Sequence, residues 1–551
     1  MRPIASIAAL GRSLSGAGLI LSALFFAISL TPSLLPRPYV LQGLLSGFAL
    51  AAGYGLGVLL VCLYEYLQIP PIANRFKVLL RGTAIVVCLT VVAITLVYTN
   101  IWQNQLRQQM SLPESSSGYQ VKIALIALLL SLVLLFLARF IIYSAHKISR
   151  KLNAYIPPRV ARLLAVAIVV SSVLLLTNDL VVRKLVATLD DIYAFSDSST
   201  DTGVIQASNP LASGSSASLI PWSTLGRTGQ NFVTSGPQKQ NLDKYFASEN
   251  MQPLRVYVGY RSADTVEARA QLALSELIRV GGFERSTLII ATPTGTGWQD
   301  PPAVDSVEYL HRGDSAIVTM QYSYLPSWLT LLLDPAKSKV SAAALFRAIH
   351  GHWRTLPAER RPDLYLFGLS LGALGAETSI DLPTLISDPI QGAVLAGPPF
   401  PSSLAPRLMR SRNPGSPQWL PVIQDSSIVR FTGQANALDI AGAEWGPMRF
   451  VYIQYASDPM VFFSTDLYWR EPDWMRGERG HDVSRSLTWY PVVTFLQLLF
   501  DLPMADRIPR GNAHNYSASS YIDAWIAVTQ PENWNEANIQ RLKKLFATSY
   551  R

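Results

Sequence analysis

The sequence predicts an α/β domain with a mostly parallel sheet, preceded by a bundle of about five transmembrane helices. Two observations support this prediction. Apolar stretches long enough to cross a bilayer fill the first part of the chain, and beyond residue 250 short β-branched runs alternate with amphipathic, helix-length ones. We therefore expect a transmembrane helical domain at 1–190, a linker rich in Ser, Gly and Pro at 191–235, and a second domain at 236–551.

The composition narrows the class of protein. The chain has 551 residues, of which 49% are apolar and 15% charged. A single core tends to stop growing at about 250–300 residues, so more than one domain is expected. The net charge is +9, but no run of Lys and Arg alternates with aromatic residues, which argues against a nucleic-acid partner. Both cysteines, Cys62 and Cys88, lie in apolar stretches, so the second domain has no cysteine nucleophile, disulfide or cysteine-bound zinc.

Five stretches reach the roughly 20 apolar residues that a bilayer core requires: 14–35, 40–67, 79–100, 121–143 and 160–182. The first is longer than the apolar region of a signal peptide and has no clear cleavage site after it, so we expect a retained helix. The second contains two GxxxG spacings, Gly43/Gly47 and Gly53/Gly57, which permit close helix contact. We expect them to pack the bundle internally; a dimer face is the alternative.

Basic residues predict the orientation of these helices. They concentrate at the amino end and in the second and fourth connections: Arg2, Arg12, Arg75, Lys77, Arg81, Lys147, Arg150, Lys151 and Arg159. Short loops rich in Lys and Arg stay in the cytoplasm. Five crossings then leave the second domain outside. We expect a multi-pass protein of the inner (cytoplasmic) membrane, with its second domain extracytoplasmic.

The second domain shows the strand and helix alternation of βαβ units. The expected strands are Arg255–Tyr260, Thr287–Pro293, Ala316–Tyr322, Asp363–Phe367, Gly392–Ala396 and Arg449–Tyr455. Helices are expected at 265–280 and 339–354. In a parallel sheet of this kind, chemistry gathers at the carboxyl ends of the strands.

A nucleophile motif follows one of these strands directly. Gly368-Leu369-Ser370-Leu371-Gly372 is a G-x-S-x-G between an apolar strand and a helix rich in small residues, which is the setting of a nucleophile elbow. In that tight turn, side chains at 368 and 372 would collide with neighbouring backbone. We therefore expect Ser370 to stand above the edge of the sheet as a nucleophile.

A serine hydroxyl needs a base to take its proton, and α/β-hydrolases supply the partners in the order Ser, acid, His. Asp458 follows the strand Arg449–Tyr455, and His514 lies further on in a loop of small residues. The sequence thus predicts a triad in which Ser370 attacks an acyl carbon, His514 is the general base, and Asp458 fixes the His tautomer.

Other residues compete for these roles. The alternative acids are Asp388, which stands close after the elbow, and three residues without a preceding strand: Asp482, Asp501 and Asp506. His481 is the alternative base. His350 and His352 could suggest a metal pair, but their i,i+2 spacing on a helix points them apart. His311 is expected in a loop or on the surface. We expect no metal and no cofactor.

The developing oxyanion requires N–H donors. The backbone N–H of Leu371 is one expected donor. A second is expected from the glycine loop formed by Thr294, Gly295, Thr296 and Gly297. This loop lacks the Lys of a P-loop and the spacing of a dinucleotide fingerprint, so phosphate binding is not expected. A plain flexible turn is the alternative.

The chain resembles a family of polytopic membrane α/β-hydrolases known as Abhydrolase_9. The resemblance rests on six segments: SLTPSLLPR at 29–37, TPTGTGW at 292–298, QYSYLPSW at 321–328, the elbow, ASDP at 456–459 and HNY at 514–516. It implies an α/β-hydrolase fold and a Ser/Asp/His triad at Ser370, Asp458 and His514. One departure is GNAHNY, where a more glycine-rich approach to the His is expected.

These features predict a membrane-anchored serine hydrolase, of the esterase or lipase type, that cleaves an acyl ester through an acyl-enzyme. A lipid ester is one expected substrate, because five helices exceed the needs of an anchor and tryptophans are frequent in the second domain. These tryptophans are Trp298, Trp328, Trp419, Trp445, Trp469, Trp474 and Trp489. The alternative is that the helices only anchor and the tryptophans only fill the core. The expected partners are the lipid bilayer and a substrate that is a small-molecule or lipid ester. The other functions left open are an acyltransferase that uses the same triad and a non-enzymatic membrane scaffold.

Overall fold

A computed structural model describes residues 14–70, 74–177, 180–379 and 382–550. The chain forms two compact units. The first unit consists of Met1–Val186, Phe463–Met475 and Asp482–Met504, and the second consists of Ala187–Phe462, Arg476–His481 and Ala505–Arg551. Two segments from late in the chain therefore belong with the amino-terminal helices, a division that the contiguous ranges expected from the sequence do not include.

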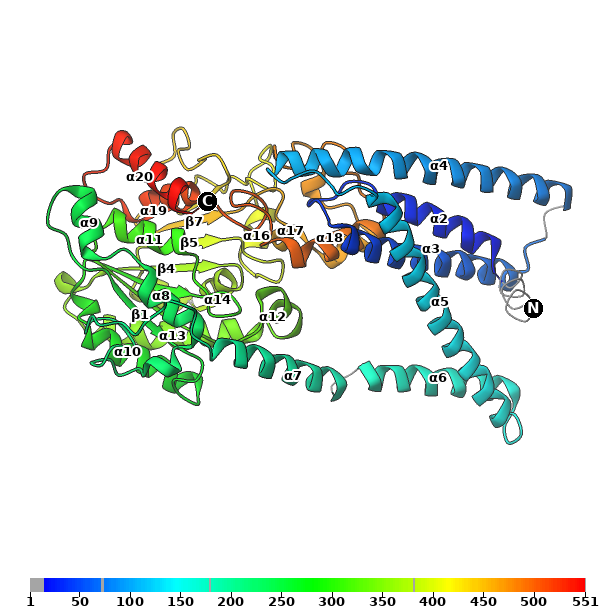
Figure 1. Cartoon of the computed structure of the whole chain (residues 1–551), viewed down its shortest axis with the longest axis horizontal. Helices are drawn as coiled ribbons and strands as arrows, with labels where there is room; N and C mark the ends of the chain where they lie inside the picture. The colour runs from blue at the N-terminus through cyan, green and yellow to red at the C-terminus, as the bar shows by residue number, and fades with distance from the viewer. Residues whose placement is uncertain (1–13, 71–73, 178–179, 380–381, 551) are drawn as a thin grey trace. The chain divides into compact units, whose positions relative to one another are not determined.

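The first unit is helical, and Figure 1 shows α2, α3 and α4 running side by side. Its helices are α2 (Gly16–Ser29), α3 (Tyr39–Tyr66), α4 (Asn74–Gln109), α5 (Tyr119–Leu152), α6 (Pro158–Thr177), η4 (Thr465–Tyr468), η5 (Asp473–Met475), α18 (Val493–Asp501) and η6 (Leu502–Met504). Helix α7 (Leu180–Asp197) runs on into the second unit. Helix α2 begins where the Ser15 side chain accepts a hydrogen bond from the Gly18 N–H. It ends before Pro32, which cannot donate to a helix.

The glycine pairs of α3 pack inside this unit. A Cβ atom at Gly43 would lie 2.7 Å from Cβ of Ile126, and one at Gly47 would lie 2.9 Å from Cβ of Leu130, both on α5. On the opposite side of α3, a Cβ atom at Gly53 would come within 2.5 Å of the Leu21 carbonyl oxygen of α2. The GxxxG spacings thus let α3 approach α5 and α2 closely, which confirms the expectation of internal packing.

Three helices of the described residues are long and apolar enough to cross a membrane, namely Tyr39–Tyr66, Gly82–Gln109 and Tyr119–Leu152. The expected number of five is therefore wrong for the part of the chain that the structure describes. The stretch at 14–35 forms only α2, whose 14 residues span about 21 Å, less than the roughly 30 Å of a bilayer core. The stretch at 160–182 becomes α6 and the start of α7, and residues 178–179 lie outside the described residues.

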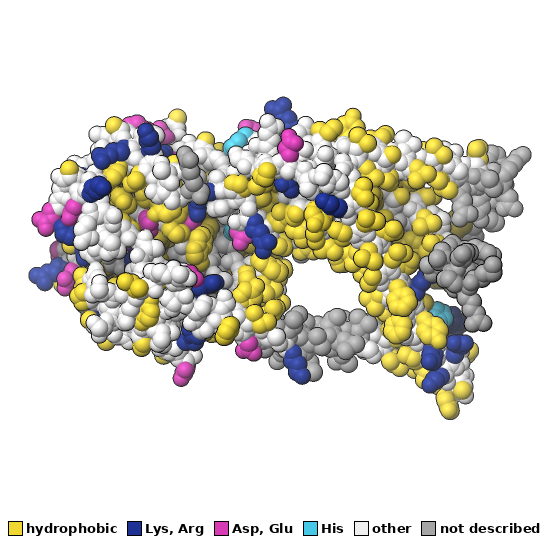
Figure 2. Space-filling model, viewed as in Figure 1, with side chains coloured by type: hydrophobic (Ala, Val, Ile, Leu, Met, Phe, Trp, Pro, Cys, Tyr) yellow, Lys and Arg dark blue, Asp and Glu magenta, His cyan; other side chains and the backbone are white. Residues whose placement is uncertain are grey.

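On the face shown in Figure 2, apolar side chains gather over the helices of the first unit, whereas charged side chains are scattered over the second. Leu129, Phe136 and Phe140 of α5 are each more than half exposed. Such a surface fits hydrocarbon rather than water. The first unit thus has the character of a membrane protein, and the expected sidedness, which rests on five crossings, stays a prediction.

The second unit contains a fully parallel seven-stranded sheet in the order β1-β3-β2-β4-β5-β7-β6 (Figure 1). The strands are β1 (Leu254–Val258), β2 (Thr287–Thr292), β3 (Ser315–Met320), β4 (Asp363–Leu369), β5 (Gly392–Ala396), β6 (Val429–Thr432) and β7 (Arg449–Ile453). Every strand expected from the sequence is present, and β6 is additional. Strands β1 to β3 are buried along their whole length, as a sheet covered on both faces requires.

The helices of this unit are η1 (Trp222–Thr224), α8 (Gly226–Ser235), α9 (Lys239–Phe246), α10 (Val266–Arg279), η2 (Gly282–Glu284), α11 (Pro301–Leu310), α12 (Ser327–Leu333), α13 (Ala336–Trp353), η3 (Ala358–Arg360), α14 (Leu371–Ser379), α15 (Leu382–Ser387), α16 (Ala405–Arg410), α17 (Pro459–Phe462), α19 (Ala518–Thr529) and α20 (Glu536–Ser549). Right-handed crossovers place α10, α13 and α14 on one face of the sheet and α11 on the other. The packing agrees, because α13 contacts α10 and α14 whereas α11 contacts α19. Helix α8 and η1 lie within the expected linker.

Candidate active site

Ser370 occupies a strained turn between β4 and α14. Its φ is +59°, a left-handed conformation that is unfavourable for a residue with a side chain. Its N–H donates to the Ala396 carbonyl at the end of β5 (2.9 Å). A Cβ atom at Gly368 would come within 2.3 Å of the Gly372 carbonyl, and one at Gly372 within 2.1 Å of the Thr292 carbonyl oxygen. The two glycines of the motif are therefore needed for the turn to close, and this is the geometry expected of a nucleophile elbow.

Asp458 and His514 meet although 56 residues separate them. Asp458 follows β7 at the start of α17, and its Oδ2 lies 2.6 Å from Nδ1 of His514. Its Oδ1 accepts the Met460 N–H (2.8 Å). Asp458 is fully buried, and His514 is 8% exposed. A buried carboxylate paired in this way can orient an imidazole and stabilise its protonated form.

Adjacent strands bring the imidazole to the same edge of the sheet as the serine. Strands β4, β5 and β7 are neighbours, and Ser370, Gly397 and Asp458 follow their carboxyl ends. Gly397 has a φ of +53°, and a Cβ atom there would lie 2.6 Å from Cε1 of His514. The imidazole thus lies against Gly397, whose neighbour Ala396 accepts the hydrogen bond of the Ser370 N–H.

The two atoms that would exchange a proton are the ones left unpaired. Ser370 Oγ and His514 Nε2 are both buried, and neither has a hydrogen-bond partner among the residues that the structure describes. No hydrogen bond joins them to each other. Buried polar atoms are almost always paired, and exceptions often mark a reactive site. The serine and the imidazole therefore have the burial and the free atoms that proton transfer requires.

The glycine loop after β2 lies against the elbow through the contact of Gly372 with Thr292. Three of its N–H groups are already used: Thr294 donates to Trp298 O (3.0 Å), Gly297 to Thr294 O (2.9 Å), and Gly295 to Ser327 Oγ (3.0 Å). In the described part of the chain, the N–H groups of Thr296 and Leu371 donate to no protein atom. Of the expected oxyanion donors, these two remain available.

Two side chains that the sequence analysis did not select hold this loop in place. Tyr257 of β1 donates its hydroxyl to the Gly297 carbonyl (2.9 Å), and Gln321, after β3, donates its amide to the Thr296 carbonyl (3.1 Å). Gln321 also accepts the Tyr260 N–H (3.0 Å). Gln321 opens the QYSYLPSW segment, so the segment was noted but its role was not.

The loop that carries His514 is fastened by further residues that the sequence analysis missed. Tyr516 donates its hydroxyl to the same Oδ2 of Asp458 that contacts the imidazole. Arg510 binds both carboxylate oxygens of Asp300 (2.9 and 3.0 Å) and donates to the Tyr516 carbonyl (2.8 Å). Burial raises the pKa of Asp300, and the Arg510 guanidinium opposes that shift. Tyr516 stands two residues from His514, which is a usable sequence signal; nothing in the sequence points to Arg510.

The competing residues have other partners or positions. Asp388 pairs with Arg361 (3.4 Å) and Asp501 with Arg37 (2.8 Å). Asp482 is buried, whereas Asp506 and His481 are exposed.

The remaining histidines also lie away from the triad. His311 lies in the turn after α11, as expected; it is half-buried, contacts two threonines, and burial lowers its pKa to about 4. His350 stacks on Phe346, and His352 contacts the ring of Phe283. Within the described residues no three His, Cys, Asp or Glu side chains converge as a metal site would require.

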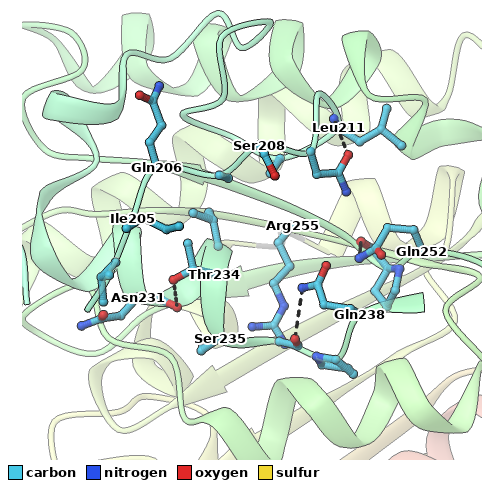
Figure 3. Close-up of a pocket in the computed structure, with 18 of the residues that line it drawn as sticks. Ile205, Gln206, Ser208, Leu211, Asn231, Thr234, Ser235, Gln238, Gln252 and Arg255 are labelled. Carbon is cyan, nitrogen blue, oxygen red and sulfur yellow. Dashed lines mark hydrogen bonds between the residues drawn. The ribbon is translucent and has the colours of Figure 1, made fainter. Parts of the chain in front are cut away.

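The second unit contains a cavity of about 510 Å³ (Figure 3). It is lined by residues of the segment after α7, of α8 and of the start of β1, including Gln206, Asn231 and Thr234. Arg255 reaches its wall, but the guanidinium is already paired with Asp305 and Glu308. None of the three triad residues lines this cavity, so it is not the pocket of Ser370.

A parallel sheet with a serine elbow after one strand and an Asp–His pair at its carboxyl edge defines the α/β-hydrolase class. Residues 254–542 match the family model described as alpha/beta-hydrolase family, and residues 30–237 match the model of that family's N-terminus. The chain therefore belongs to the alpha/beta-hydrolase family. No curated protein and no solved structure matches it.

Proposed function

We propose that this protein is a membrane-anchored serine hydrolase that cleaves an acyl ester, with Ser370 as nucleophile, His514 as general base and acid, and Asp458 as the group that orients His514. The observation that carries the proposal is the buried Asp458–His514 contact of 2.6 Å beside a serine held at a φ of +59°. The unpaired Ser370 Oγ and His514 Nε2 support it further.

In the acylation step, Ser370 Oγ attacks the ester carbonyl carbon while His514 Nε2 accepts the hydroxyl proton. The negative charge on the carbonyl oxygen is stabilised by the N–H groups of Leu371 and Thr296. The C–O bond to the alcohol then breaks, and His514 gives its proton to the leaving oxygen.

In the second step a water molecule attacks the acyl-enzyme and passes a proton to His514. The bond to Ser370 Oγ breaks, the acid leaves, and the proton returns to the serine. Both steps use the same N–H donors and the same imidazole.

Ester turnover tests the proposal. Purified full-length protein should hydrolyse short p-nitrophenyl esters, and Ser370→Ala should lower kcat by about 10⁴-fold or more. Ser379→Ala is a matched control, because Ser379 lies on the same helix and, among the described residues, its hydroxyl bonds the Ala376 carbonyl alone. Equal turnover by Ser370→Ala and the control would refute the assignment of the nucleophile.

We propose further that the substrate is a lipid ester. Between Asp458 and His514 the chain contributes two segments to the first unit. One of them contains α18, which packs on α2 and α3. The ring centroids of Phe500 and Phe48 lie 5.8 Å apart. A hydrolase anchored in a bilayer by its first unit shares that bilayer with esters that carry long acyl chains. Turnover should rise from short p-nitrophenyl esters to phospholipids in vesicles; no preference for the amphiphile would remove this part of the proposal.

A further inference from the structure

The turn that joins α5 to α6 in the first unit carries a cluster of positive charge. Figure 2 shows Lys and Arg side chains gathered there beside apolar ones. Five exposed cations form this cluster, which we call the basic turn: Lys147, Arg150, Lys151, Arg159 and Arg162. The sequence has no Asp or Glu between Glu114 and Asp179, and among the described residues none of the five cations forms an ion pair. Five positive charges are thus left without a counterion from the described part of the chain.

The stability of α6 does not account for two of these cations. Arg159 and Arg162 lie at the amino end of α6, which has no acidic residue in its first turn. The amino end of a helix carries partial positive charge, so that acids stabilise it and cations do not. The Arg162 Nε reaches the Pro158 carbonyl at 3.4 Å, from an exposed position. Both guanidinium groups are therefore available to an anion.

The basic turn follows the apolar part of α5 at the depth of lipid headgroups. Residues 123–142 of this helix contain one charged residue, Arg139. At 1.5 Å per residue they span about 30 Å, the thickness of a bilayer core. Lys147 and Lys151 follow at about 8 and 14 Å along the helix axis. Tyr155, in the turn itself, is 87% exposed, and tyrosine favours the interface between lipid and water. The basic turn therefore faces the phosphate groups of one leaflet.

Two of the cations border a hollow that also has apolar walls. This hollow of about 510 Å³ is lined by Arg159, Arg162, Leu163 and Val166 of α6. Their spacing of i, i+3, i+4 and i+7 places the four residues on one face of the helix. Leu163 is 71% exposed, and Val166 is more than half exposed. One face of α6 thus presents two cations followed by an apolar surface, which is the order of groups in an anionic phospholipid.

We propose that the basic turn binds an anionic phospholipid, with the phosphate on Arg159 and Arg162 and an acyl chain along Leu163 and Val166. Guanidinium groups suit this role because their paired N–H donors match the oxygens of a phosphate. The other three cations attract the headgroups of neighbouring lipids. All of these residues lie in the first unit, so the proposal is independent of the function proposed for Ser370.

The test uses the full-length protein in a neutral detergent. It is titrated with phosphatidylglycerol or phosphatidylcholine of the same acyl chains, and bound lipid is counted by native mass spectrometry. The two lipids differ in net charge, which is negative for the first and zero for the second. Inorganic phosphate, added at the lipid concentration, separates a lipid site from a site for the free anion.

The double variant Arg159→Gln/Arg162→Gln is compared with Lys244→Gln/Arg347→Gln. The control removes the same charge from exposed positions of the second unit. A Lys or Arg beside an anionic membrane surface contributes about fivefold to binding, so the double variant should bind phosphatidylglycerol about 25-fold more weakly. Its binding of phosphatidylcholine should change little, and the control should behave as the wild type. Thermal unfolding checks that both variants fold.

The wild type alone gives a second result. Salt screens exposed charges, so added salt should weaken the binding of phosphatidylglycerol and leave that of phosphatidylcholine nearly unchanged. A wild type that binds both lipids equally, or whose bound lipid is displaced by inorganic phosphate, would overturn the proposal. Equal binding of phosphatidylglycerol by the double variant and the control would also overturn it. Each of these results leaves the proposed hydrolase function intact.

Discussion

Two buried polar clusters of this protein differ in how completely they are paired. Around Arg37, every guanidinium nitrogen has an acceptor. Around His514, one ring nitrogen is paired with Asp458, whereas the other and the hydroxyl of Ser370 have no partner among the described residues. Full pairing fixes a side chain in one place, and a buried polar atom without a partner often marks a reactive site. Variants in the second cluster should therefore act through chemistry.

Asp458→Asn is expected to have the largest effect and tests the reactive cluster directly. The amide keeps the size of the carboxylate but favours the wrong tautomer of His514, so kcat should fall by about 10⁴-fold. The fold should persist, and circular dichroism with thermal unfolding checks this. Asp388→Asn, a carboxylate paired with Arg361, is the control. Similar losses in both variants would contradict the assigned role of Asp458.

Tyr516→Phe removes the second donor to Asp458 Oδ2 and leaves the ring in place. A hydrogen bond to a charged group is worth roughly 1.5–3 kcal/mol, so kcat should fall by about tenfold. Tyr245→Phe is the matched control, since the Tyr245 hydroxyl is buried and has no partner within the described residues. If Tyr516→Phe turned over ester at the wild-type rate, Tyr516 would contribute only packing.

His311 extends the comparison, because it is a half-buried polar side chain with both ring nitrogens paired. Nδ1 contacts Thr287 Oγ1 (3.0 Å) and Nε2 contacts Thr529 Oγ1 (2.9 Å). Burial lowers the pKa of His311 to about 4, whereas in the unfolded chain it lies near 6.5. Between these values the unfolded chain binds more protons, so stability should fall as the pH drops from about 6.5 to 4, by roughly 3 kcal/mol at most.

His311→Gln should flatten this acid dependence of thermal unfolding and leave kcat at pH 7 nearly unchanged. His481→Gln, at an exposed position, should keep the wild-type dependence. A large loss of turnover in His311→Gln, without a change in stability, would contradict a purely structural role.

The sheet was largely predictable because its strands are short apolar runs that stand apart from helical patterns. Strand β6 was not predicted, because Arg430 lies in its middle and interrupts the apolar run. The structure pairs that guanidinium with the carbonyls of Ser426 and Leu438 and stacks it 3.9 Å from the ring centroid of Trp445. These contacts of Arg430 are tertiary, and no local sequence pattern predicts them.

The membrane helices were harder to predict because hydropathy measures composition and not helix length. The stretch at 14–35 is apolar throughout, yet Pro32 and Pro36 end the helix early, so α2 is too short to span a bilayer. Asp501 was weighed only as a rival acid, because no local pattern in the sequence shows its ion-pair partner. Its partner Arg37 stands 464 residues away.

The residues of the candidate site also fall into a group that the sequence predicts and a group that it does not. Ser370 and Asp458 follow strands and His514 lies in a later loop, and this order of serine, acid and histidine is visible in the sequence. The residues that hold them in place, such as Arg510 with its partner Asp300, meet only after folding, over a separation of 210 residues. Sequence thus predicts the candidate reactive groups, whereas the groups that hold them in place are found only through tertiary contacts.

Peptide mapping after reaction with a fluorophosphonate probe tests the central claim most directly. The wild type should carry one adduct, on Ser370, and Ser370→Ala should carry none. An adduct on another serine, or no adduct on folded wild-type protein, would contradict the account.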